Sequence, residues 1–284
     1  MGDRKVAILG ARSLVGQCLL RRLMEDDWKI LAYSRQPQHE IPEMKWLLLP
    51  CAAAEQAVSW ICVAPIWVLP DYFPLFEASG ARRIVALSST SRFTKVSSGD
   101  LLEAAVAARL IEAEARLRAW AEHRGVEWVI LRPTLIYGLG QDKNIAEMMR
   151  FIRRFGFFPL LGEAIGLRQP IHAGDVAGAC LAAVQAPRAA NRAYNISGGE
   201  TLSYRDMVAR VFFALGRPAR LLAVPLWAFS LAVALLRCLP RYRHWSAAMA
   251  ERMNGDLVFD HSDAVRDLAF APRRFALTRE DFPR

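Results

Sequence analysis

The sequence contains few cysteines, few lysines and no run of charges of one sign. Its five cysteines are odd in number and none of them forms a C-x-x-C pair, which argues against a disulfide framework or a zinc site and favours a reducing, cytoplasmic compartment. The N-terminal residues show no cleavable signal pattern. Only five of the 37 basic residues are lysines, and the arginines are scattered, so the formal net charge of +9 does not predict nucleic-acid binding. The charge favours phosphorylated ligands or an anionic membrane surface as partners.

Short apolar segments alternate with amphipathic ones through the first half of the chain. With 54% hydrophobic and 23% charged residues over 284 positions, the chain can bury a large core. Strands are expected at 6–9, 28–33, 46–49, 59–63, 83–87 and 127–131, and helices at 14–23 and 100–123. This alternation predicts an α/β fold, a doubly wound parallel sheet covered by helices on both faces.

The pattern becomes less regular after about residue 144. Helices are expected near 144–155, 175–184 and 204–215, with a short strand at 193–196. We therefore predict two domains, a first one over residues 1–155 and a smaller, partly interleaved one over residues 156–284.

Residues 221–236 form the most apolar stretch of the chain. These sixteen residues are fewer than the roughly 20 that a helix needs to cross a bilayer, and Pro225 and Ser230 interrupt the run. Arginines flank both ends, with Trp227 and Trp245 nearby, as in helices that lie at a membrane surface. The stretch is expected either to be a buried helix that lines a groove for a substrate or partner, or to make peripheral membrane contact.

A glycine-containing turn lies between the first expected strand and the first expected helix. Gly10 allows the chain to turn sharply, and Gly16 lets the helix pack close to the strand. The free N–H groups and the positive end of the helix dipole at this point are suited to binding phosphate. Together with the end of the second strand, the turn provides the predicted cofactor-binding residues, which are Gly10, Arg12, Ser13, Leu14, Val15, Gly16, Ser34 and Arg35.

The end of the second strand indicates which nucleotide is bound. A cofactor with a free adenosine 2′-hydroxyl is usually met there by an Asp or Glu, but this strand ends in Tyr33, Ser34 and Arg35. Arg35 can pair with a 2′-phosphate and stack on the adenine, and Arg12 in the turn can reach the same phosphate. The two arginines favour NADP over NAD, unless both side chains are simply solvated.

Several further motifs follow the glycine turn in a fixed order. They are Leu-Ser-Ser-Thr at 87–90, Leu-Arg-Pro-Thr at 131–134 with Tyr-Gly at 137–138, Pro-Ile-His-Ala-Gly-Asp-Val-Ala at 170–177 and Tyr-Asn-Ile at 194–196. In this order they resemble the extended short-chain dehydrogenase/reductase superfamily, of the NAD-dependent epimerase/dehydratase type. The resemblance implies a Rossmann domain followed by a C-terminal substrate domain, often for nucleotide sugars. In NADP-using members an arginine inside the glycine turn contacts the 2′-phosphate, which agrees with Arg12.

Two departures from the family pattern bear on activity. Ser13 replaces the middle glycine of the turn, so a Cβ crowds the approach to the pyrophosphate, although the hydroxyl can donate to a phosphate oxygen. The resemblance also implies an acid–base tyrosine four residues before a lysine, and none of the five lysines has one. Aligning the family's glutamate with Glu114 puts Val106 and Leu110 at these two positions, and a shift of one residue brings Arg109 near the place of the lysine.

Four residues remain as candidates for catalysis or substrate binding. Thr90 matches the family's Ser or Thr that hydrogen-bonds the reacting hydroxyl, with a strand-end cap as its alternative role. Tyr137 and His172 are candidates for proton transfer, with support of the domain junction and packing in a loop as the alternatives. Asp175 is expected to be the N-cap of the helix that follows. Arg168 is the candidate for binding an anionic substrate group where the two domains meet.

The motifs leave two functions open. The first is an NADP-dependent reductase or epimerase that acts on a nucleotide-linked or phosphorylated substrate through a non-standard acid–base group. The second is a non-catalytic NADPH-binding accessory or sensor protein that docks on a membrane complex or a regulatory partner. No metal site is expected in either case, and the substrate itself is not readable from the motifs.

Overall fold

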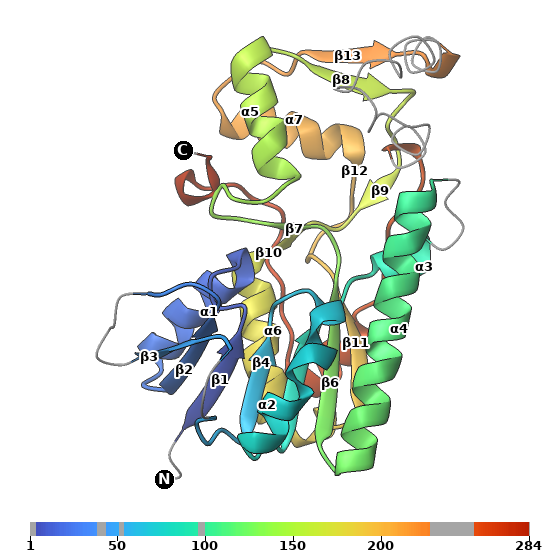
Figure 1. Cartoon of the computed structure of the whole chain (residues 1–284). Coiled ribbons are helices and arrows are strands. Elements are labelled where there is room, and N and C mark those ends of the chain that lie inside the picture. The colour runs from blue at the N-terminus through green and yellow to red at the C-terminus, as the bar shows by residue number, and fades with distance from the viewer. Residues whose placement is uncertain (1–3, 39–43, 51–53, 96–99, 228–252, 284) are drawn as a thin grey trace.

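The central layer of the protein is a parallel β-sheet of seven strands. The structure, a computed structural model, describes residues 4–38, 44–50, 54–95, 100–227 and 253–283. Neighbouring strands in this sheet are all parallel, in the order β11-β6-β5-β4-β1-β2-β3 (Figure 1). Their bounds are β1 Lys5–Leu9, β2 Lys29–Ser34, β3 Met44–Leu48, β4 Ser59–Cys62, β5 Arg83–Leu87, β6 Glu127–Pro133 and β11 Arg192–Ile196.

Helices cover both faces of this sheet and divide its core in two. One face is covered by α1 (Leu14–Glu25), α6 (Ala173–Gln185) and α10 (Ser262–Leu268). The other face is covered by the 3-10 helix η1 (Ile66–Tyr72), α2 (Phe73–Ala78) and α4 (Leu101–Arg124). Because both faces are covered, the inner strands are apolar and almost fully buried.

Local signals at its two ends define the longest helix, α4. The side chain of Asp100 accepts hydrogen bonds from the amides of Leu102 and Glu103 and so caps the first turn. Gly125 ends the helix in the left-handed conformation, with a φ of 66°. The short helix α3 (Ser91–Thr94) precedes α4 and follows the end of β5.

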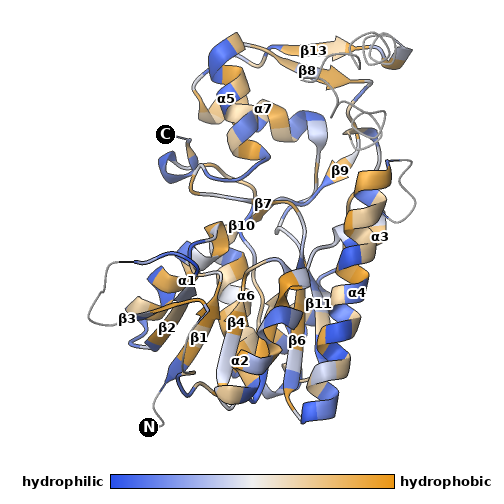
Figure 2. Ribbon diagram, viewed as in Figure 1, coloured by the Kyte–Doolittle hydropathy of each residue, from blue (hydrophilic) through white to orange (hydrophobic). Residues whose placement is uncertain are grey.

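A smaller region lies beyond the carboxyl ends of the sheet strands (Figure 1). Its helices are α5 (Ile145–Phe155) and α7 (Tyr204–Ala214), which share a separate hydrophobic cluster. Its short strands form three pairs: β7 (Ile136–Tyr137) with β10 (Ile171–His172), β9 (Leu167–Arg168) with β12 (Leu202–Ser203), and β8 (Phe158–Leu161) with β13 (Leu221–Val224). Figure 2 shows hydrophobic residues concentrated in the sheet strands and in β8 and β13.

The predicted α/β fold with a doubly wound parallel sheet is confirmed. The expected elements are present with shifted ends; for example, the strand expected at 46–49 is β3, which begins at Met44. The division at residue 155 stays a prediction. α6, β11 and α10 all follow that residue in sequence and yet belong to the layers of the central sheet.

The apolar stretch 221–236 does not begin as a helix. Its first four residues form β13, which runs parallel to β8 with Leu221 opposite Phe158 and Val224 opposite Leu161. For residues 221–224 the expectation of a helix is wrong, because β8 offers a strand edge whose backbone groups pair with this segment. Leu226 and Trp227, which follow Pro225, are helical. Residues 228–236 lie outside the described residues. In the part of the chain that the structure describes, no helix is long and apolar enough to cross a membrane.

Candidate functional site

The glycine turn brings three backbone segments into close contact at the end of β1. Gly10 has a φ of +90°, and a Cβ atom there would lie 2.5 Å from the amide nitrogen of Ala64. A Cβ atom on Gly16 would lie 2.5 Å from the carbonyl oxygen of Ala11. Both positions therefore require glycine, and the start of α1 is held against the end of β1, where a helix N-terminus can receive a phosphate.

Ser13, which stands in place of the middle glycine, is the N-cap of α1. Its Oγ accepts a hydrogen bond from the amide of Gly16 at 3.1 Å. This bond uses the hydroxyl oxygen as an acceptor, so the hydroxyl hydrogen can still be donated to a phosphate oxygen. The side chains of Leu14 and Val15 pack against the core, and their backbone amides are what these two residues can offer to a ligand.

A cleft of about 890 Å³ opens at the carboxyl ends of β1 and β2. We refer to it as the nucleotide cleft. Five of the eight predicted cofactor-binding residues line it, namely Gly10, Arg12, Ser13, Ser34 and Arg35. Because the carboxyl ends of adjacent parallel strands meet at one edge, residues from two separate strands are brought together there.

The nucleotide cleft also contains two side chains that the sequence analysis did not identify. The side chain of Gln36 accepts a hydrogen bond from Nη1 of Arg12, and its backbone N–H donates to Ser34 Oγ at 3.1 Å. Asp71, on η1, brings a carboxylate into the cleft although β2 does not end in one. The position of Gln36, directly after Arg35, was a usable signal, whereas no motif marked Asp71.

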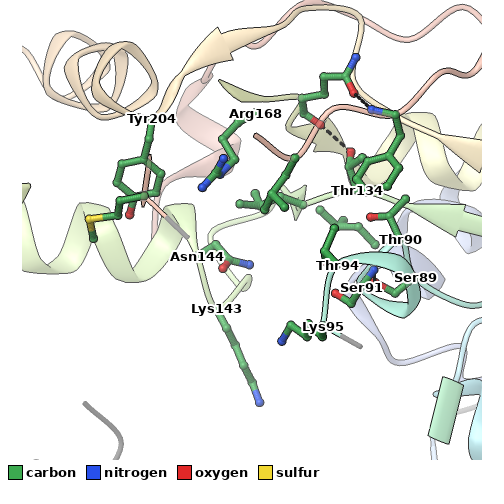
Figure 3. Close-up of a pocket in the computed structure, with 16 residues that line it drawn as sticks. Ser89, Thr90, Ser91, Thr94, Lys95, Thr134, Lys143, Asn144, Arg168 and Tyr204 are labelled. Atoms are coloured by element: carbon green, nitrogen blue, oxygen red, sulfur yellow. Dashed lines mark hydrogen bonds between the residues drawn. The ribbon is translucent and has the colours of Figure 1, made fainter. Parts of the chain in front are cut away.

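A second cleft, of about 740 Å³, lies between the sheet and the smaller region (Figure 3). We refer to it as the substrate cleft. It brings together two predicted site residues from distant parts of the chain, Thr90 after β5 and Arg168 on β9. Lys95, Lys143 and Tyr204 line the same space, so the cleft is rich in cationic groups. This charge favours an anionic ligand.

Arg168 is buried with part of its hydrogen-bonding capacity unused. The residue is 3% exposed, and its Nη1 donates to the carbonyl oxygens of Leu167 and Gly255 at 2.6 and 2.8 Å. Its Nη2 has no protein partner among the described residues. Burial lowers the pKa of Arg168, because removal from water destabilises the charged form of the guanidinium. An unpaired buried cationic donor is unfavourable unless a ligand anion accepts from it.

Thr90 is held at the floor of the substrate cleft. Its Oγ1 donates to the carbonyl oxygen of Pro133 at 3.2 Å. The hydroxyl is therefore oriented so that its oxygen can accept a hydrogen bond from a ligand hydroxyl. Tyr204 lines the opposite side of the same cleft (Figure 3), and burial raises its pKa to about 12, so this phenol stays protonated at neutral pH.

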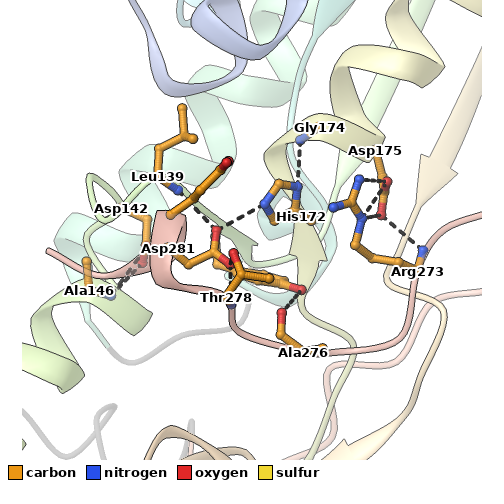
Figure 4. Close-up of polar contacts among 12 residues, drawn as sticks. Leu139, Asp142, Ala146, His172, Gly174, Asp175, Arg273, Ala276, Thr278 and Asp281 are labelled. Atoms are coloured by element: carbon orange, nitrogen blue, oxygen red, sulfur yellow. Dashed lines mark hydrogen bonds and ion pairs between the residues drawn. The ribbon is translucent and has the colours of Figure 1, made fainter. Parts of the chain in front are cut away.

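Tyr137 and His172 lie elsewhere, with their rings in contact and each bonded to the C-terminal segment. Figure 4 shows His172 beside Asp281 of that segment. Nδ1 of His172 accepts from the amide of Gly174 at 3.0 Å, which leaves the ring proton on Nε2, 3.1 Å from Asp281 Oδ1. The hydroxyl of Tyr137 donates to the carbonyl oxygen of Ala276 at 3.3 Å, and burial raises the pKa of Tyr137 to about 12. Neither side chain lines the two clefts described above. Their roles in proton transfer stay predictions.

The helix after β10 begins earlier than the sequence analysis expected. Asp175 is not the N-cap of a helix that starts at Val176; α6 begins at Ala173 and its N-cap is His172. Asp175 lies in the first turn and forms an ion pair of 2.9 Å with Arg273. The imidazole of His172 accepts from the amide of Gly174 and so caps the helix, while the carboxylate of Asp175 pairs with the C-terminal segment.

Comparison with known proteins agrees with this arrangement of motifs. Residues 75–197 match the model of the NAD dependent epimerase/dehydratase family. The chain is therefore similar to members of this family. The fold is also that of the solved UDP-N-acetylglucosamine 4-epimerase from Bacillus cereus, with a TM-score of 0.70 at 15% identity over 94% of this chain and 91% of that one.

The curated relatives that this chain resembles differ in what their names say they act on. A UDP-glucose 4-epimerase from Vibrio cholerae is 29% identical over 57% of this chain and 47% of its own length. A 2-alkyl-3-oxoalkanoate reductase from Stenotrophomonas maltophilia is 26% identical over 75% of this chain and 76% of its own. The chain spans about half the length of two of the curated relatives that it matches.

In this chain, α4 presents apolar residues where the resemblance implies the acid–base pair. Leu110 is buried in the core beneath the sheet, and Val106 packs against the same cluster. Arg109, the residue that a shift of one position would bring near the place of the lysine, has its guanidinium 4.6 Å from the ring centre of Trp67. Its side chain lies against η1 and does not line either described cleft.

Proposed function

We propose that this protein binds NADP in the nucleotide cleft and acts as an atypical reductase or epimerase on a substrate with a phosphate or another anionic group, held in the substrate cleft. The observation that carries the proposal is the gathering of Arg12, Ser34 and Arg35 around the glycine turn. Two guanidinium groups and a hydroxyl at one cleft edge suit a 2′-phosphate. The adenine and its ribose then lie at the carboxyl end of β2, and the pyrophosphate lies at the start of α1.

The residues present fit the dinucleotide in its phosphate-binding part. A Cβ at either glycine of the turn would collide with backbone, so the tight approach that a pyrophosphate needs is preserved although Ser13 replaces the middle glycine. Asp71 is the feature that argues for NAD, since a carboxylate accepts from ribose hydroxyls and repels a 2′-phosphate. Arg12, Arg35 and their net charge outweigh it in this proposal.

The anionic group of the substrate is assigned to Arg168. The free Nη2 of this buried side chain supports the assignment, because an anion in the substrate cleft would complete its hydrogen bonding. Lys143 and Lys95 line the same cleft and add to the attraction. Thr90 would contact the reacting hydroxyl or carbonyl of the substrate, at the side of the cleft that faces the sheet.

A second function is supported by the residues of α4. Leu110 is buried and Val106 is apolar, so neither can exchange a proton with a ligand beside Thr90. On this basis the protein is an NADPH-binding accessory or sensor subunit that performs no chemistry, docked on a membrane complex or a regulatory partner. Peripheral membrane contact through residues 221–236 belongs to this alternative.

Calorimetric titration with NADPH and NADH tests the cofactor assignment. We expect NADPH to bind at least tenfold more tightly, since a paired 2′-phosphate contributes well over 1.4 kcal/mol. The double variant Arg12→Ala/Arg35→Ala should lose this preference while still binding NADH. A matched control removes two exposed arginines of α4, Arg116 and Arg124, and should keep the preference. Equal affinities in the wild type would refute the assignment to NADP.

Turnover assays decide between the two functions. Protein loaded with NADPH is mixed with a panel of nucleotide sugars, phosphorylated carbonyl compounds and 3-oxo acids, and cofactor oxidation is followed by absorbance. Turnover that falls at least tenfold in Thr90→Val, with NADPH affinity unchanged, supports the enzyme. No turnover with any compound, together with stable co-purification of a partner, supports the accessory protein.

A further inference from the structure

The substrate cleft does not end at Arg168. It continues into a second space of about 620 Å³ between α5, β8 and α7. We refer to this space as the apolar chamber. Tyr204 and Met253 line both the substrate cleft and the apolar chamber, so the two spaces adjoin. A ligand bound at Arg168 can therefore extend past Tyr204 into the chamber.

The wall of the chamber is dominated by six apolar side chains, which are Leu135, Met148, Phe151, Phe158, Met207 and Met253. Met207 is fully buried, and the rings of Phe151 and Phe158 meet edge to face with their centres 5.5 Å apart. Thioether side chains adapt their shape to an irregular apolar ligand, and aromatic rings add contact area. The wall is therefore suited to a flexible hydrocarbon group.

Most polar groups of the chamber lie at its rim and have partners within the protein. Glu147 pairs with Arg150 at 2.7 Å, and Arg150 also donates to the carbonyl oxygen of Gly140 at 3.1 Å. The guanidinium of Arg154 lies over an aromatic ring of the same helix. A nucleobase in the chamber would need several in-plane donors and acceptors, whereas the neutral polar side chains in its described lining are those of Asn144 and Tyr204.

We propose that the apolar chamber binds the hydrocarbon chain of an amphiphilic substrate whose anionic group lies at Arg168. The inference rests on the proposed function for the position of the anion and adds the class of substrate. The cationic rim agrees with it, because Lys143 and Arg150 attract the same anionic group toward the entrance. Burying the chain in the chamber provides affinity that grows with chain length, and the anion fixes its orientation.

Calorimetry with n-butyl, n-hexyl and n-octyl phosphate, each below its micelle concentration, tests the proposal. A fully buried methylene strengthens binding by about fourfold, so we expect each added pair of methylenes to lower Kd by about fifteenfold. Phe151→Gln should at least halve the slope of log Kd against the number of methylenes. The control is Phe213→Gln on α7, whose side chain is 86% exposed and lies outside the chamber. If Phe151→Gln does not fold, Met253→Gln provides the same test.

Other outcomes overturn the proposal, and they separate it from the proposed function. If all three phosphates bind equally and Arg168→Met abolishes binding, the anion site stands and the chamber does not hold a chain. If uridine monophosphate binds more tightly than hexyl phosphate and Phe151→Gln weakens it, a nucleobase occupies the chamber. If 1-octanol binds as tightly as octyl phosphate, with loss in Phe151→Gln, the anion at Arg168 is refuted along with the substrate part of the proposed function.

Discussion

Replacing Glu114 by Gln is expected to be the most destabilising single-charge change in this protein. Glu114 lies on α4 and is fully buried. Its carboxylate accepts from Ser88 Oγ at 2.6 Å and from Arg132 Nε and Nη2 at 3.1 and 2.7 Å, and it pairs with Arg92 at 2.9 Å. The side chains of the two arginines are only 17% and 13% exposed, so this carboxylate is their main source of compensating charge.

The magnitude follows from leaving two guanidinium groups together without an anion. Removing one partner of a buried ion pair typically destabilises a protein by about 3–5 kcal/mol, because the remaining charge stays desolvated. For a chain of this size, each kcal/mol corresponds to roughly 2–4 °C in Tm, so Glu114→Gln should lower Tm by roughly 6–20 °C. Ser88 also loses its acceptor charge, which loosens the segment that carries Thr90.

Urea and thermal unfolding followed by circular dichroism measure the effect. The control is Glu112→Gln, two residues away on the same helix and exposed, which should change stability by less than about 0.5 kcal/mol. Adding Arg132→Met to Glu114→Gln should recover part of the lost stability, because it removes one of the two facing cations. A loss below about 1 kcal/mol for Glu114→Gln would refute this reasoning, since the cluster would then be compensated by water or by rearrangement.

Three further predictions follow from the described contacts. Gly16→Ala should lower NADPH affinity and stability together, because its Cβ would lie 2.5 Å from two carbonyl oxygens of the turn; titration and unfolding of one preparation measure both. Burial alone would raise the pKa of Asp281, but hydrogen bonds from His172 and from the backbone amide of Thr278 outweigh the effect of burial and lower the pKa. The stability that Asp281 contributes is therefore present above the ordinary aspartate pKa and is lost as pH falls below about 4. In Asp281→Asn the urea midpoint should change less between pH 6 and pH 3 than it does in the wild type. An equal fall of the urea midpoint in the two proteins would contradict this. Burial raises the pKa values of Cys62 and Cys180, the latter to about 12, so both thiols should resist a thiol reagent at pH 8 in the native protein and react fully in urea.

Much of the nucleotide cleft was predictable because its signals are local. A glycine that follows a buried strand and precedes an amphipathic helix specifies a tight turn, and Gly10 has the positive φ that this turn requires. Ser34 and Arg35 were placed beside the turn by one topological rule, that parallel strands end at the same edge of a sheet. Thr90, which lines the substrate cleft, was predicted instead from the family resemblance.

The substrate cleft was less accessible from sequence because it is built from segments that carry no periodic signal. Arg168 was identified through the family resemblance, but its unpaired Nη2 depends on where Leu167 and Gly255 place their carbonyl groups. The apolar chamber had no sequence signature, since Met148 and Phe151 read as ordinary core positions of an amphipathic helix. A residue that faces a cavity and one that faces a packed core have the same hydropathy.

The sequence by itself determined the order of strands and helices along the chain, the two required glycines and the arginines that line the nucleotide cleft. Each of these depends on backbone sterics or on neighbours a few residues away. Tertiary structure decided the rest through contacts between distant segments. The C-terminal segment supplies Asp281 to His172, and the imidazole displaces Asp175 as the helix cap. Likewise, β8 draws residues 221–224 into a strand, because an unpaired strand edge competes for backbone hydrogen bonds with the helix that their composition suggested.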